Sequence, residues 1–213
     1  MILPFVRDLF ADVENLPAFG RAASHLKAGT GRITLSGLTP TAKALLISLW
    51  ARAAGKPLIV IVPNNRAAED LQPNVTAFAE LSGSLRKDAE IVTLPATDVL
   101  PYEGLSPHPE IQEARAAALW RMAQGTAAVT IVPIAAAAMR LREPEFYFML
   151  ARPLRRGDTV EIDSLVQWLN TVGYTGVDVV EMPGEYAVRG GILDVYGPEM
   201  ERPVRVELFG DEV

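Results

Sequence analysis

The chain has 213 residues, 49% of them hydrophobic and 22% charged, so it can bury the core of one large or two small domains. Its net charge of −6 argues against a general polyanion-binding protein, because neutralising phosphates requires clustered cations. The absence of cysteine excludes disulfides, thiol catalysis and thiolate metal sites, and the lack of a signal peptide or of a long apolar run favours a cytoplasmic protein without a membrane span.

The first 150 residues alternate short apolar runs with helical patterns. The runs are rich in Ile, Val and Leu and predict strands buried on both faces, at 33–35, 58–62, 91–94 and 129–132. Apolar stripes with helical spacing predict helices at 42–54, at 71–81, where Pro73 kinks or breaks the segment, and at 111–122. The alternation predicts an α/β domain over residues 1–152, in which a parallel sheet carries helices on both faces.

The segment between the first predicted strand and the first predicted helix has the position of a phosphate-binding loop. Gly37 and Lys43 occupy the first and seventh positions of G-x-x-x-x-G-K-[ST]. Ala42 replaces the second glycine and adds a Cβ where the backbone must approach phosphate. Ala44 replaces the hydroxyl that would bind Mg²⁺. The loop is therefore degenerate, and we predict no nucleotide cofactor.

The same segment has a second interpretation as an ordinary turn, in which Thr39 is the N-cap of the helix and Pro40 its first residue. Either way, the strand at 129–132 ends without a carboxylate that could hold Mg²⁺, which argues against an active ATPase. Histidine occurs only at His25 and His108, and neither has metal-ligand spacing. We predict no catalytic site and no metal site.

The pattern changes after Arg152, which indicates a smaller α+β domain over residues 153–213. Asp163 is a candidate N-cap for a helix that ends at Gly173. Short strands separated by Pro and Gly are predicted at 177–180, 186–189, 192–196 and 204–209. Because the chain stops directly after a strand pattern, we expect it to be truncated from a longer protein.

The last predicted strands carry a candidate recognition surface. Arg189 ends one strand, and Arg205, Glu207 and Phe209 share one face of the last strand by period two. An exposed aromatic side chain beside arginines is typical of a protein-binding hot spot. The alternative is a surface ion pair of Arg205 with Glu207 or Asp194, with the phenyl ring folded back onto the sheet.

Three stretches resemble a known family. EYAVRGGILDVY at 185–196 and PVRVELFGDEV at 203–213 resemble the homology module shared by UvrB and the bacterial transcription-repair coupling factors, Mfd. LPATDVLPYEGLSPH at 94–108 is similar to the corresponding stretch of the coupling factors, and the likeness spans about residues 30–213. The resemblance implies a helicase-like first domain that has lost its nucleotide site. UvrB keeps an intact phosphate loop and a long aromatic hairpin, whereas this chain has a short loop with Tyr102 alone, which favours the coupling factors.

The resemblance also implies a partner. In the family the second domain binds UvrA, the damage-recognition ATPase of nucleotide excision repair, and the matching positions here are Arg189, Arg205 and Phe209. The expected function is a non-catalytic module that recruits UvrA at stalled RNA polymerase, with contacts to the polymerase and DNA made by other domains of the parent protein. One alternative is a UvrB-like damage-binding helicase subunit with residual nucleotide binding. Another is a structural domain that holds the motor inactive.

Overall fold

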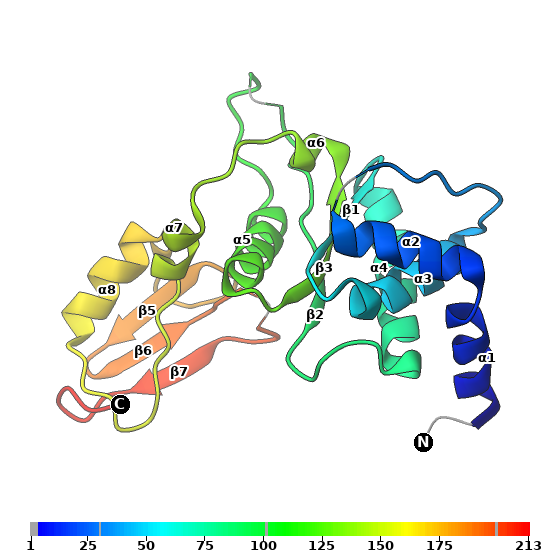
Figure 1. Ribbon diagram of the computed structural model, residues 1–213. Helices are drawn as coiled ribbons and strands as arrows, with labels where there is room; N and C mark the ends of the chain where they lie inside the picture. Colours follow the sequence, from blue (N-terminus) through cyan, green and yellow to red (C-terminus); the bar gives the residue numbers. More distant parts are fainter. Residues whose placement is uncertain (1–3, 30, 101, 199) are drawn as a thin grey trace. The chain divides into compact units, whose positions relative to one another are not determined.

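The computed structural model describes residues 4–29, 31–100, 102–198 and 200–213, which form two compact units (Figure 1). Unit 1 contains residues 1–96 and 124–140, and unit 2 contains residues 97–123 and 141–213. The unit that includes 153–213 thus also takes in residues that precede the expected boundary at 152, which stays a prediction. No helix in the described ranges is long and apolar enough to cross a membrane.

Unit 1 is built on a three-stranded parallel sheet with the order β1-β3-β2. The strands are β1 (Leu58–Val62), β2 (Glu90–Thr93) and β3 (Ala127–Pro133), which confirms three of the predicted strands. The central strand β3 is apolar along most of its length, and Val129 and Ile131 are fully buried. A strand with neighbours on both sides and no alternation of polar residues is the expected pattern for a parallel sheet.

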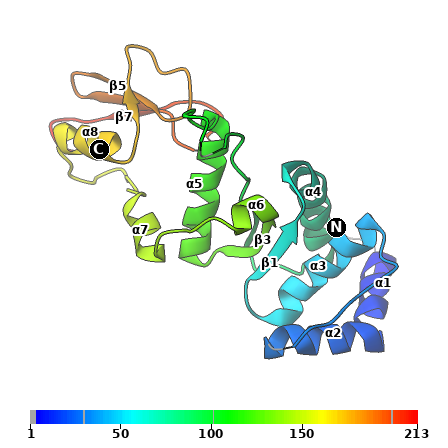
Figure 2. The same cartoon turned by 90° about the horizontal axis from the view of Figure 1, so that it is seen from above.

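In the part of unit 1 that the structure describes, four helices come before β2, and two of them pack on the sheet (Figure 2). They are α1 (Pro4–Glu14), α2 (Pro17–Ala28), α3 (Pro40–Ala54) and α4 (Asn65–Ser82). Side chains of α3 and α4 form one apolar cluster with β1 and β3, and Phe19 of α2 packs with Leu49 of α3 in another. The helix α4 continues through Pro73, so the alternative of a break there is wrong. A short helix, α6 (Ile134–Ala137), follows β3.

The prediction of a strand at 33–35 is wrong. Residues 32–36 have neither strand nor helix structure, and Ile33 and Leu35 are 40% and 42% exposed. These two side chains alternate with polar ones, and the segment has no hydrogen-bonded neighbour strand. The conformational entropy lost in ordering it as a strand is therefore not offset by hydrogen bonds or burial. Consequently β1 is an edge strand, and on the face of β1 away from α3 and α4 the side chains of Ile59 and Ile61 are exposed.

Unit 2 contains a four-stranded sheet with the order β4-β5-β6-β7. Its elements are α5 (Pro109–Gln124), α7 (Pro144–Met149), α8 (Ile162–Thr171), β4 (Thr175–Gly176), β5 (Glu185–Arg189), β6 (Ile192–Val195) and β7 (Val204–Glu207). The strands β5, β6 and β7 are antiparallel, whereas β4 runs parallel to β5. Leu165 and Leu169 of α8 pack on Tyr186 and Leu193, so the helix covers one face of the sheet (Figure 2).

Two local predictions for unit 2 are wrong. The N-cap of α8 is Glu161, and Asp163 lies in the first turn, where its charge favours the positive end of the helix dipole. Residues 177–180 do not form a strand; pairing with β5 is made by Thr175–Gly176, and the chain then curls away. The carboxylate of Glu185 stabilises this curl, because it accepts hydrogen bonds of 2.8 Å from the backbone N–H groups of Glu181 and Met182.

Candidate protein-binding surface

The register of β5, β6 and β7 sorts their side chains into two faces. Asp194 pairs with Arg205, and Ile192 pairs with both Arg189 and Glu207. Because paired residues of antiparallel strands project on the same side, the four charged residues share one face. We call this face, defined by Arg189, Asp194, Arg205 and Glu207, the outer face. On the opposite face, Tyr186, Leu193 and Val206 belong to the apolar cluster that contains Leu165 and Leu169 of α8.

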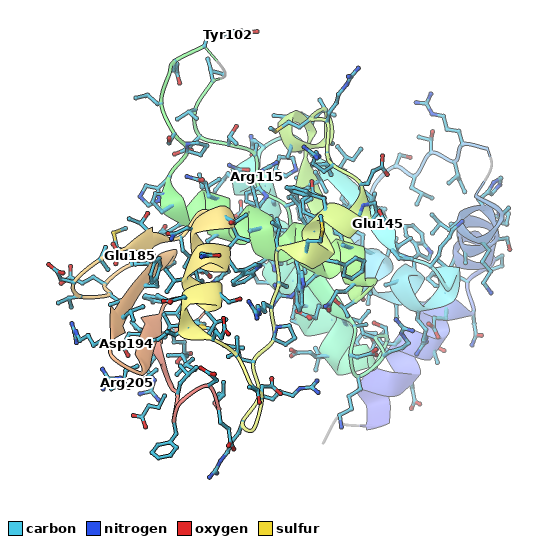
Figure 3. The ribbon with its side chains drawn as sticks, turned by 90° about the vertical axis from the view of Figure 1, so that its left-hand side faces the viewer. Tyr102, Arg115, Glu145, Glu185, Asp194 and Arg205 are labelled. Atoms are coloured by element: carbon cyan, nitrogen blue, oxygen red, sulfur yellow. The ribbon has the colours of Figure 1, made fainter. Side chains whose placement is uncertain are left out.

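A bidentate ion pair lies at the middle of the outer face. Arg205 donates from Nε to Oδ1 of Asp194 at 2.7 Å and from Nη2 to Oδ2 at 2.9 Å, and the two side chains lie side by side in Figure 3. These hydrogen bonds from Arg205 lower the pKa of Asp194 below its ordinary value and raise that of Arg205. The Arg205 side chain is still 54% exposed, so the pair orients the guanidinium without burying it.

Arg189 lies beside this pair. Its Nη2 donates to the carbonyl oxygen of Asp178, which ties the strand end to the curl after β4. Arg189 also contributes to the field that lowers the pKa of Asp194, after the larger effect of Arg205. The structure thus brings two of the predicted site residues to one depression of about 460 Å³, lined by Val179, Val180, Arg189, Asp194, Pro203 and Arg205.

Phe209 lies two residues beyond the end of β7 and is 94% exposed. Leu208 packs in the core of unit 2, so the next side chain points to the opposite side of the chain. The backbone N–H of Phe209 donates to the carbonyl of Glu212 at 2.9 Å, which closes a tight turn. The ring is therefore not folded onto the sheet, and that part of the alternative interpretation is wrong. Phe209 does not line the depression shared by the arginines.

The segment Gly37–Ala44 forms the turn of the second interpretation. Oγ1 of Thr39 accepts a hydrogen bond of 3.2 Å from the N–H of Ala42, and Pro40 is the first residue of α3, which confirms Thr39 as the N-cap. Ala44 is fully buried among α3, α4 and the sheet, while Lys43 is exposed. The methyl group of Ala44 is therefore part of the core of unit 1.

The loop at residues 97–108 is a second exposed feature of unit 2. The carboxylate of Asp98 accepts hydrogen bonds of 3.1 and 3.3 Å from the N–H of His108, which fixes the base of the loop. Toward the tip, Leu100, Tyr102 and Leu105 are 63%, 93% and 66% exposed, and Figure 3 shows Tyr102 at the tip. One aromatic in the part of this loop that the structure describes is fewer than a stacking platform for single-stranded nucleic acid requires.

No group of three or more His, Asp or Glu residues in the described part of the chain is arranged to hold a metal ion.

Sequence reasoning missed one polar residue that shapes the site, Glu185. Its pKa is lowered because the backbone N–H groups of Glu181 and Met182 bind the charged form. A single glutamate at the start of a strand has no sequence pattern from which this role could be predicted.

Comparison with known proteins found a family model that matches the end of the chain and relatives that match most of its length. Residues 153–213 match the family model described as the UvrB interaction domain. The chain is 31% identical over 188 residues to a transcription-repair-coupling factor of Bacillus subtilis and 36% identical over 193 residues to one of Mycobacterium tuberculosis, in each case over 88% of this chain. It is 30% identical over 198 residues, or 93% of this chain, to one of Escherichia coli. The chain spans only about 15% of the length of these relatives.

Proposed function

We propose that this chain is a docking module for UvrA. Residues 153–213 match the model of the UvrB interaction domain, and 88% of the chain is similar to a transcription-repair-coupling factor. The module recruits UvrA for nucleotide excision repair at a stalled RNA polymerase. Contacts with the polymerase and with DNA belong to other parts of the longer parent protein. The observation that carries the proposal is the outer face, where Arg189 and Arg205 flank the carboxylate of Asp194. The strand of Arg205, β7, leads to the exposed ring of Phe209.

The arginines suit a partner that presents carboxylates. Asp194 engages only Nε and Nη2 of Arg205, so the other N–H donors of the guanidinium are available to an incoming acidic side chain. Because the ion pair already holds Arg205 in one orientation, little conformational entropy is lost when the partner binds. Arg189 is anchored in the same way by the carbonyl of Asp178.

Phe209 supplies the apolar anchor of the contact. Its ring is 94% exposed in this chain, and its backbone is fixed by the turn that ends at Glu212. A rigid aromatic side chain that becomes buried only on binding is the usual centre of an interface hot spot. The ring and the arginines are the three residues to which we assign the UvrA contact.

For unit 1 we propose a helicase-like scaffold without a working nucleotide site. Support comes from the alanines at positions 42 and 44 and from the burial of Ala44 in the core, where no hydroxyl could reach a metal ion. The module would then be non-catalytic, and Gly37 and Lys43 would be remnants of a phosphate loop. A UvrB-like subunit would instead bind nucleotide, so tight binding of Mg-ATP by this chain, measured by calorimetry, would contradict the proposal for unit 1.

The experiment that tests docking measures the affinity of purified UvrA for the chain by calorimetry, with Arg189→Ala, Arg205→Ala and Phe209→Ala compared singly. Loss of a hot-spot anchor typically costs about 2 kcal/mol, so Phe209→Ala should weaken binding about 30-fold. Each arginine variant should weaken binding about tenfold or more. Arg156→Ala, an exposed arginine of the same unit, is the matched control and should leave the affinity within about twofold.

Two outcomes would contradict the proposal in different ways. If the unaltered chain fails to bind UvrA, the recruitment function is wrong. If it binds and all three variants bind equally well, UvrA docks elsewhere, and the outer face serves only the fold.

A further inference from the structure

The strand next to the outer face is an edge strand. In the sheet order β4-β5-β6-β7, β7 pairs with β6 alone, and within the described residues no other segment pairs with it. An edge strand presents backbone N–H and C=O groups that lack partners in the sheet, and such an edge can accept an added strand from another protein.

The pairing register identifies which groups face the open edge. The N–H of Leu208 donates to the carbonyl of Gly191 at 2.7 Å, so the backbone groups of Leu208 point toward β6. In an antiparallel strand the direction alternates with each residue. The backbone groups of Val204 and Val206 therefore also point toward β6, and those of Arg205 and Glu207 point away from it, to the open edge.

The open edge is short and closed at both ends. Pro203, before the strand, has no N–H to donate. Phe209, after the strand, uses its N–H and C=O in the turn with Glu212, at 2.9 and 3.4 Å. The open edge therefore offers one N–H and one C=O group on each of Arg205 and Glu207. This set of backbone groups fits an extended partner segment of only a few residues.

We propose that a segment of UvrA adds to this edge as a further strand and exchanges backbone hydrogen bonds with Arg205 and Glu207. This inference rests on the proposed function, because UvrA is chosen as the occupant by continuity. The same strand carries the Arg205 side chain on the outer face and leads directly to Phe209. Charged side chains along an edge discourage unspecific pairing, so the added segment has to match an arginine and a glutamate in alternating positions.

A substitution by proline separates the backbone contribution from the side chain. Glu207→Pro removes an N–H that points to the open edge and leaves the hydrogen bonds to β6 in place, and proline is tolerated at such edge positions. Glu207→Ala removes the same side chain and keeps the N–H. We expect Glu207→Pro to weaken the binding of purified UvrA about tenfold or more relative to Glu207→Ala, which reports the side-chain contribution alone. Equal affinities for the two variants would overturn the inference.

Amide hydrogen exchange of the unaltered chain, followed by NMR, decides the question even if the proline variant does not fold. The amides of Arg205 and Glu207 should exchange fast in the free chain and slowly in the UvrA complex, while that of Val206 is protected in both. UvrA binding without protection of the two amides would overturn the added strand and leave the docking function standing. Failure of UvrA to bind would overturn both. Protection without UvrA that grows with chain concentration would identify a second copy as the occupant, against this inference.

Discussion

The two sheets of this protein differ in where their polar side chains lie. The parallel sheet of unit 1 has a central strand, β3, buried along most of its length, and the turn before α3 uses Thr39 to cap the helix. The antiparallel sheet of unit 2 packs one face on α8 and leaves Arg189, Asp194 and Arg205 on the other. The parallel sheet thus exposes few polar side chains to a ligand, whereas the alternating pattern of β5 to β7 keeps charged side chains at the surface.

Damage to each core separately tests whether the two units have different roles. Leu193 is 2% exposed in the core of unit 2, and Leu193→Ala should cost about 2–5 kcal/mol of unfolding free energy and reduce UvrA binding. Ile131, fully buried in unit 1, should lose a similar amount on replacement by alanine without loss of UvrA binding. Urea denaturation of both variants, followed through the indole NMR signals of Trp50 and Trp168, gives the two stabilities.

An Ile131→Ala variant that keeps its fold in unit 2 but loses UvrA would contradict the assignment of docking to the antiparallel sheet. The same result would indicate that unit 1 takes part in the contact with UvrA.

Gly191, between β5 and β6, tests how closely β6 and the end of β7 approach each other. A Cβ at Gly191 would lie 2.6 Å from the carbonyl oxygen of Leu208, a backbone atom, so Gly191→Ala should force β6 and β7 apart and cost about 1–3 kcal/mol. Gly20 in α2 has nothing within 4 Å of the added Cβ, and Gly20→Ala should stabilise the chain by about 0.5–1 kcal/mol. Thermal unfolding measures both, and equal melting temperatures for the two variants would contradict the tight approach at Gly191.

Much of the fold could be predicted from the sequence because burial leaves a strong local pattern. The predicted strands at 58–62, 91–94 and 129–132 are rich in Ile, Val and Leu, and they proved to be the parallel sheet. The predicted strands at 33–35 and 177–180 failed because an apolar run forms a strand only when a neighbour pairs with it. That pairing depends on the tertiary structure, which no short window of sequence contains.

The site divides in the same way. Alternation along β7 correctly predicted that Arg205 and Glu207 share a face, and an ion pair of Arg205 with Asp194 was one of the alternatives. The position of Arg189 beside them depends on the hairpin register and on the curl after β4, which the sequence did not reveal. The assignment of Arg189, Arg205 and Phe209 to a UvrA contact stays a prediction.

Removal of the helix cap in unit 1 should have a smaller effect on stability, and it tests the hydrogen bond between Thr39 and the start of α3. Thr39 Oγ1 accepts the hydrogen bond from the N–H of Ala42, so Thr39→Ala should destabilise unit 1 by about 1 kcal/mol. Thr41, exposed in the first turn of α3, is the matched control, and Thr41→Ala should change stability by less than about 0.5 kcal/mol. Chemical denaturation measures both; a larger effect at Thr41 than at Thr39 would contradict the cap.

The smallest effect concerns the ion pair of the outer face. Arg205 lowers the pKa of Asp194, so the pair stabilises the fold at pH values above the ordinary pKa of an aspartate, and this contribution disappears as the pH falls through the lowered pKa. In Arg205→Ala the pKa of Asp194, followed by NMR of its carboxyl carbon, should rise toward the ordinary value, whereas Glu207→Ala should leave it lowered. Because both side chains lie at the surface, the stability gap between parent and Arg205→Ala should be small at neutral pH and close at acid pH. An unchanged Asp194 titration in Arg205→Ala would mean that the pair does not hold the guanidinium in solution, and the outer face would then be no better prepared for a partner than any other charged surface.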